Sequence, residues 1–176
     1  MGIRIAPSAD LATLPIAIQI IGIASAAIPA SFLMSKIGRK LGFLFGTLLG
    51  ISATLLAAYA ISLESFILFV TASFFIGNYI AFLQQFRFAV AESVSQEEVP
   101  RSLSILMLAG IVAALLGPEV GRRFSEVGGL PLYVGSFLGL ALMLSISFLI
   151  LLLFYKNTNV EMPNSGIGKR SLSEIF

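Results

Sequence analysis

Two long apolar segments joined by a very short basic turn constrain this chain more than any other feature. Leu11 to Met34 and Leu41 to Ile61 are each long enough to cross a bilayer as a helix, because about 20 residues span its hydrocarbon core. Only residues 35–40 lie between them, so the chain must reverse at the membrane surface within about six residues. The pattern predicts helices that cross a membrane one after another.

Three further apolar segments extend this pattern toward the C-terminus. We predict an all-α, polytopic membrane helix bundle with five transmembrane helices, preceded by an external lead at 1–10 and followed by a flexible cytoplasmic tail at 157–176. The bundle occupies 11–156, and its predicted spans are 11–34, 41–61, 66–91, 102–121 and 132–154.

The composition agrees with a chain surrounded by lipid. Hydrophobic residues make up 57% of the sequence and charged residues 11%, which is far from the balance of soluble domains. The net charge is only +2 and the sequence has no polybasic stripe, so no nucleic-acid partner is predicted. The sequence contains no Cys and no His, which argues against disulfides, imidazole bases and most metal sites. We therefore predict no cofactor and no metal.

Small residues in the spans indicate where helices pack closely. Gly42, Gly46 and Gly50 recur every four residues and form a ridge on which another helix can approach the backbone. In the fourth span, Gly110, Gly117 and Pro118 are predicted to serve helix packing, with a bend at the proline.

The distribution of cations predicts the orientation of the chain. With the 35–40 turn in the cytoplasm, the positive-inside rule is satisfied by eight cations against three, with the N-terminus outside and the C-terminus inside. We expect a multi-pass protein of the plasma (inner) membrane. The inner cations are Lys36, Arg39, Lys40, Arg87, Arg101, Lys156, Lys169 and Arg170, and the outer ones are Arg4, Arg122 and Arg123.

The basic turn resembles the signature loop of the major facilitator superfamily (MFS), G-x-L-a-D-R-x-G-R-K. The matching positions are Leu33, Lys36, Gly38, Arg39 and Lys40. Two positions differ, because Ser31 replaces the family's Gly and Ser35 replaces its Asp. The Gly117-Pro118 pair is similar to a family motif of the fifth span, which the resemblance links to antiporters.

In the family the signature loop follows the second span and the Gly-Pro motif lies in the fifth. In this chain the loop follows the first predicted span and the Gly117-Pro118 pair lies in the fourth, so both motifs occur one span earlier. The resemblance therefore implies a partial N-terminal half-bundle corresponding to spans two to six, with the first span and the whole second half missing. It also implies alternating-access transport of a small solute of unknown identity, with coupling to protons as one possibility. Because the family binds substrate between two halves, we expect this chain to be an incomplete half whose partner is the missing transporter half, from the same gene or a separate chain.

Several polar residues are candidates for a site, and each has a structural alternative. By resemblance, the turn residues Ser35, Lys36, Gly38, Arg39 and Lys40 form a cytoplasmic gate, and the same cations also suit an anchor to lipid headgroups. Polar groups within the spans either face substrate or coupling ions, or bond to a neighbouring helix. These residues are Gln19, Asn78, Gln85 and Arg87.

Glu119 is the one acid predicted within a span. An intramembrane carboxylate suits a proton carrier, whereas Arg122 and Arg123, three and four residues later, suit an ion pair at the helix surface. The leading hypothesis for the whole chain is transport. The alternative is a small polytopic membrane protein with a structural or assembly role. An enzyme is not predicted, because no residues stand at nucleophile–base spacing.

Overall fold

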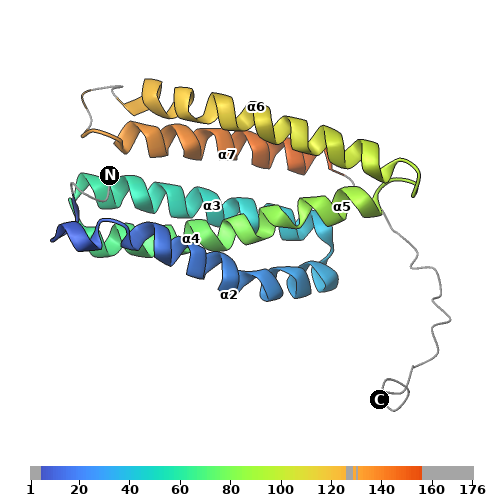
Figure 1. Cartoon of the computed structure of the whole chain (residues 1–176), viewed down its shortest axis with the longest axis horizontal. Coiled ribbons are helices and arrows are strands. Elements are labelled where there is room, and N and C mark those ends of the chain that lie inside the picture. Colours follow the sequence, from blue (N-terminus) through green and yellow to red (C-terminus); the bar gives the residue numbers. More distant parts are fainter. Residues whose placement is uncertain (1–4, 126–128, 130, 156–176) are drawn as a thin grey trace, which may run out of the picture.

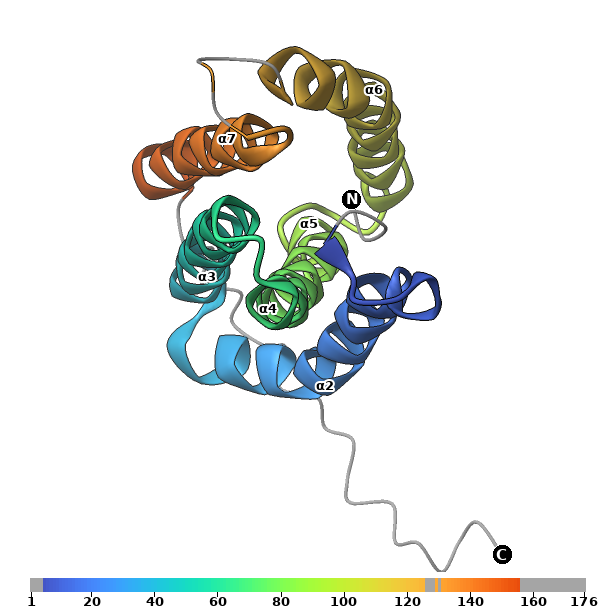
Figure 2. The same ribbon diagram turned by 90° about the vertical axis from the view of Figure 1, so that its left-hand side faces the viewer.

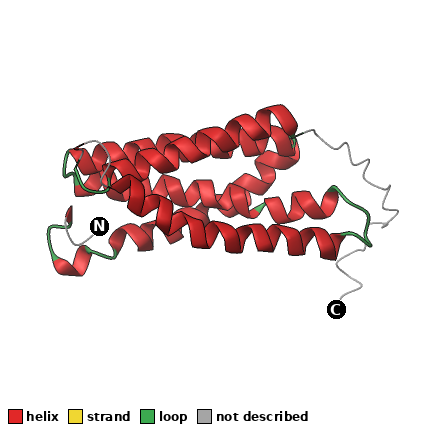
Figure 3. Ribbon diagram, turned by 90° about the horizontal axis from the view of Figure 1, so that it is seen from above, coloured by secondary structure: helices red, strands yellow, loops and turns green. Residues whose placement is uncertain are grey.

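The computed structural model consists of helices joined by short loops, and it describes residues 5–125, 129 and 131–155. No strand occurs among these residues, as Figure 3 shows by its colouring. The elements are the 3-10 turn η1 (Ala9–Leu11) and the helices α2 (Leu14–Ile37), α3 (Arg39–Ser62), α4 (Phe66–Gln84), α5 (Phe86–Glu92), α6 (Val99–Ser125) and α7 (Val134–Phe154). The predicted tail at 157–176 lies outside the described residues.

Five helical segments within the described residues are long and apolar enough to cross a membrane. Helices suit this setting because each one satisfies its own backbone hydrogen bonds where no water is present. The prediction of an all-α bundle with five membrane-spanning helices is confirmed. The segments are Ala9–Ile37, Arg39–Ser62, Phe66–Glu92, Val99–Ser125 and Val134–Phe154.

The third segment is made of two helices rather than one. Gln85 lies between the end of α4 and the start of α5, and its N–H donates to the Phe82 carbonyl at 3.1 Å. The Ala89 N–H then donates to the Gln85 carbonyl at 3.1 Å, which starts the next helical turn. Neither Gly nor Pro marks this joint, so the sequence predicted a continuous span.

α4 lies in the middle of the bundle, with α2 and α3 packed against it and α7 packed against α3 (Figures 1 and 2). α6 lies at the edge, where its main contacts are with α7 and α5. Figure 1 also shows that the α2–α3 turn and the C-terminal ends of α5 and α7 share one end of the bundle. Residues far apart in the sequence therefore meet at the basic turn.

The ridge of Gly42, Gly46 and Gly50 packs closely. A β-carbon at Gly46 would lie 2.6 Å from the Phe82 side chain, and one at Gly50 would lie 2.7 Å from the Tyr79 ring, both on α4. At Gly42 it would collide with Met34 of α2. Here the four-residue spacing correctly indicates the contact face of α3.

The glycines of α6 do not pack in this way. A β-carbon at Gly110 or Gly117 would meet no atom within 4 Å among the described residues, and Pro118 is exposed. The prediction that they serve helix packing is therefore not met by any described helix. The physical reason is the edge position of α6, whose one buried residue is Ser125, near its end.

Candidate functional site: the basic turn and the groove beside α6

The basic turn owes its shape to Gly38. This residue has φ of +87°, a conformation that residues with a β-carbon rarely adopt, and it joins the end of α2 to the start of α3. Its N–H donates to the Met34 carbonyl at 3.0 Å, and its carbonyl accepts from the Gly42 N–H at 3.1 Å. Gly38 thus lets two membrane-spanning helices follow each other with almost no loop.

Arg39, the first residue of α3, forms a bidentate ion pair with Glu92 at the end of α5. Its Nε lies 3.0 Å from Oε2 of Glu92, and a second guanidinium nitrogen bonds Oε1. The Arg39 side chain is 26% exposed and that of Glu92 48%, so the pair is partly shielded from solvent. It ties the turn to the third span, 53 residues away in the sequence.

An aromatic cluster lies beside this ion pair. Phe43 is 2% exposed, and its ring stacks on that of Phe86 with centroids 4.0 Å apart and planes 15° apart. The ring of Tyr155, just beyond α7, meets Phe43 edge-on at 5.7 Å. Burial raises the pKa of the Tyr155 hydroxyl, while the charge of nearby Arg39 lowers it and that of Glu92 adds to the rise. The hydroxyl is therefore neutral at physiological pH.

Two other turn residues, Ser35 and Lys36, contact their own helix. Lys36 places its Nζ 4.4 Å from the centre of the Phe32 ring, which is a cation–π contact. Ser35, at the position of the family's Asp, donates from its hydroxyl to the Phe32 carbonyl at 2.8 Å. Arg39, by contrast, contacts a distant helix through Glu92.

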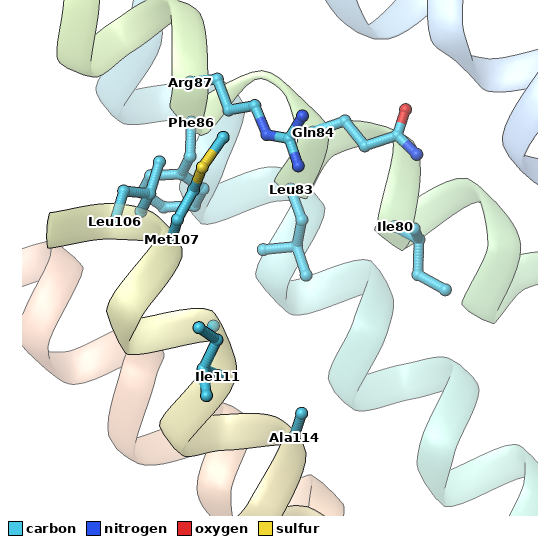
Figure 4. Close-up of a pocket in the computed structure, with 10 residues that line it drawn as sticks. Ile80, Leu83, Gln84, Phe86, Arg87, Leu106, Met107, Ile111 and Ala114 are labelled. Carbon is cyan, nitrogen blue, oxygen red and sulfur yellow. The ribbon is translucent and has the colours of Figure 1, made fainter. Parts of the chain in front are cut away.

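A groove of about 560 Å³ lies between the α4–α5 joint and α6. Its walls are mostly apolar, and its polar side chains are Gln84 and Arg87 (Figure 4). Both polar residues are exposed, and the described acids form no ion pair with Arg87. Glu92, five residues after Arg87 in the sequence, pairs with Arg39.

The remaining candidates lie in different parts of the bundle. Asn78 is half-buried and donates from Nδ2 to the Phe74 carbonyl at 2.9 Å. Gln85 is 8% exposed at the α4–α5 joint and does not line the groove. The neighbouring Gln84 lines it instead, and the sequence analysis did not select that residue. Gln19 lies where α2 crosses α4, and its backbone carbonyl faces Gly77. The candidates therefore do not converge on one site.

Glu119 adopts the arrangement expected of a surface ion pair. Its two carboxylate oxygens each lie 2.8 Å from a guanidinium nitrogen, one of Arg122 and one of Arg123. Both arginine side chains are 77% exposed. Both oxygens of the carboxylate are thus bonded to arginines of the same helix.

Comparison with known proteins agrees with this architecture. The family model described as Major Facilitator Superfamily matches residues 4–175. The chain belongs to the Major Facilitator Superfamily. This member of the superfamily is accordingly a multi-pass membrane protein whose helices are surrounded by a lipid bilayer.

One curated protein that is similar in sequence to this chain is the riboflavin transporter RfnT of Brucella anthropi. The two are 30% identical over 143 residues, which cover 81% of this chain and 36% of that protein. The MFS chain described here therefore spans about a third of the length of the curated relative it matches. No solved structure matches the chain.

Proposed function

We propose that this chain forms part of an MFS-type secondary transporter that moves a small solute across the plasma membrane by alternating access. The observation that carries the proposal is the superfamily match over 4–175 together with a relative that is named as a transporter. The chain acts as an incomplete half, and its partner is the rest of the transporter, from the same gene or a separate chain. It is not an enzyme.

Riboflavin is the first solute to test, because the 30% identical relative is named for it. The groove beside α6 suits a largely apolar, aromatic solute with some polar atoms. Its apolar walls would hold a planar ring system, and Gln84 and Arg87 would supply hydrogen-bond donors at one end. Further helices would complete the walls that α4, α5 and α6 begin.

In the proposed orientation the basic turn faces the cytoplasm and the N-terminus lies outside, with Lys36, Arg39 and Lys40 on the inner surface. The Arg39–Glu92 ion pair would fix the inner ends of α3 and α5 relative to each other. Such a fixed unit can rotate as a rigid body during alternating access.

The test compares riboflavin uptake into proteoliposomes that hold either this purified chain or the product of the complete natural reading frame. We expect saturable uptake with the longer product and none with this chain, because a half-site cannot alternate its access. Saturable uptake by this chain would contradict the incomplete-half proposal. If neither preparation takes up riboflavin while the longer product moves another solute, the substrate assignment is wrong and transport stands.

The role of the groove is tested in the same assay with two arginine variants. Arg87→Ala is expected to reduce uptake at low substrate concentration, because it removes the groove's cation. Arg101→Ala is the matched control, since Arg101 is exposed in the first turn of α6 and does not line the groove. Equal uptake by the two variants would remove Arg87 from the substrate site.

The alternative of an assembly role has one observation in its favour. α6 leaves Gly110 and Gly117 without a neighbour in the described residues, and small residues of this kind favour helix association in lipid. A natural product of 18.8 kDa that co-purifies in a stable complex and gives no uptake would support this role.

A further inference from the structure

A second cavity lies between α2, α3 and α4. Its volume is about 290 Å³. It opens on the outside of the bundle, because two of its aromatic walls, Phe45 and Phe75, are 49% and 38% exposed. The cavity is lined by Ser25, Ala26, Pro29, Ala30, Leu33, Phe45, Leu49, Phe75, Asn78 and Phe82.

One wall of this cavity carries a backbone acceptor that α2 itself does not satisfy. Pro29 has no N–H, so the carbonyl of Ser25 lacks the donor that a helix normally supplies four residues later. Ser25 and Pro29 both line the cavity. The Ser25 hydroxyl donates to the Gly22 carbonyl at 3.0 Å, which uses its proton and leaves its oxygen able to accept.

The facing wall carries a second acceptor, on Asn78. The bond from its side chain to the Phe74 carbonyl, 2.9 Å long, requires a donor and so identifies the bonded atom as Nδ2. The amide oxygen Oδ1 is then left to accept. Within the described residues, the cavity thus brings together oxygen acceptors from α2 and α4 in a mostly aromatic and aliphatic chamber.

We propose that this cavity binds a neutral, lipid-soluble alcohol or phenol that enters from the bilayer. Its hydroxyl would donate to Ser25 or Asn78, and its apolar body would lie among the phenylalanine rings. Acceptors left without donors are costly in hydrocarbon, which favours a ligand with a hydroxyl over a pure hydrocarbon. No carboxylate lines the cavity to hold a cation. A single water fills about 30 Å³, a small part of the space.

This inference is independent of the proposed transport. Asn78 and Arg87 face different cavities, one between α2, α3 and α4 and the other between the α4–α5 joint and α6. Binding at the first is measured without any solute movement.

The test uses two photoreactive probes that differ in one hydrogen-bond donor, 4-hydroxybenzophenone and 4-methoxybenzophenone. The purified chain in lipid nanodiscs is irradiated with each probe, and the labelled residues are mapped by peptide mass spectrometry. We expect the hydroxyl probe to label the cavity walls about three- to tenfold more than the methoxy probe, the range for one hydrogen bond in lipid. Exposed α7 residues such as Leu153 report non-specific labelling from the bilayer.

Two variants each take one acceptor away from the ligand, one by deleting it and the other by giving it a donor within the helix. Asn78→Leu deletes the amide oxygen, whereas Pro29→Ala leaves Asn78 in place and gives the Ser25 carbonyl an N–H donor in its own helix. We expect each variant to reduce the preference for the hydroxyl probe. Thr71→Val is the matched control, because exposed Thr71 on α4 bonds its own helix at 2.9 Å and does not line the cavity.

The proposal stands if the preference falls in both variants and persists in Thr71→Val. Equal labelling of the cavity walls by the two probes would overturn it. An unchanged preference in Pro29→Ala and Asn78→Leu would also overturn it, because the hydroxyl would then be bound elsewhere.

Discussion

Gly22 on α2 and Gly77 on α4 face each other so closely that neither position has room for a β-carbon. A β-carbon on Gly22 would collide with the carbonyl oxygen of Phe74, and one on Gly77 with that of Gln19. In both cases the obstacle is backbone, which cannot rotate away as a side chain can. Close backbone approach of this kind drives helix association in lipid, where the hydrophobic effect between helices is absent.

Gly77→Ala is therefore expected to separate α2 from α4. The added methyl group forces the two backbones apart, and overpacking of this kind costs about 1–3 kcal/mol. The free energy of unfolding in mixed detergent–SDS micelles, followed by circular dichroism, measures the loss. A change within error of zero would mean that the helices do not approach as the structure describes.

Gly110→Ala is the matched control for this substitution. It places the same methyl group on a helix in lipid, at a position that has no atom within 4 Å among the described residues. We expect no loss of stability and a gain of up to about 1 kcal/mol from the better helix propensity of Ala. A clear loss would show that another surface packs against α6 in the sample.

The Arg39–Glu92 ion pair is expected to contribute coupling energy that a double-mutant cycle can isolate. Arg39→Ala, Glu92→Ala and the double variant should give a coupling of about 0.5–1 kcal/mol, since the pair is bidentate and partly shielded. The coupling should weaken in high salt. Additive effects of the two single changes would contradict a direct interaction.

Arg39→Lys separates charge from geometry in the same assay. Lysine keeps the positive charge but cannot hold both oxygens of Glu92 in a planar, bidentate arrangement. We expect most of the coupling to be lost. Full coupling in Arg39→Lys would mean that charge alone holds the α2–α3 turn against α5.

The sequence predicted the features that depend on local composition. Apolar length indicated the membrane spans, and the four-residue spacing of Gly42, Gly46 and Gly50 indicated the contact face of α3. For Gly110 and Gly117 the packing role stays a prediction, because a small-residue pattern shows that a helix can pack closely but does not show which neighbour it meets, and no described residue lies within 4 Å of a β-carbon there.

Contacts between distant segments could not be predicted in this way. Gly22 and Gly77 each belong to a series of small residues at four-residue spacing, Gly22, Ala26 and Ala30 on α2 and Ser73, Gly77 and Ala81 on α4, but that spacing does not show which helix each series meets. Glu92 lies only five residues from Arg87 in the sequence, yet the chain reversals bring it to Arg39, 53 residues away. Which acid meets which base depends on tertiary packing, which local patterns do not encode.

The stack of Phe43 on Phe86 provides a test of the aromatic cluster beside the turn. Phe43→Leu keeps a buried apolar side chain but removes the aromatic pairs with Phe86 and Tyr155. Such pairs contribute about 0.5–1.5 kcal/mol each beyond buried area, so we expect a loss of about 1–2 kcal/mol in the micelle assay. Phe88→Leu, at an exposed position of α5, is the control and should have little effect.

A substitution at Glu119 distinguishes the two roles considered for this acid, proton carrier and surface ion pair. Its carboxylate is already bonded to Arg122 and Arg123, which lie on the same helix and are largely exposed. Glu119→Gln should therefore leave the pH profile of uptake by the complete transporter unchanged, because two guanidinium groups stabilise the charged form of the carboxylate and so oppose its protonation. Stability should also change little, since ion pairs at an exposed helix surface are weak. A pH profile that becomes flat in Glu119→Gln, with normal protein levels in the membrane, would instead identify this residue as the proton carrier.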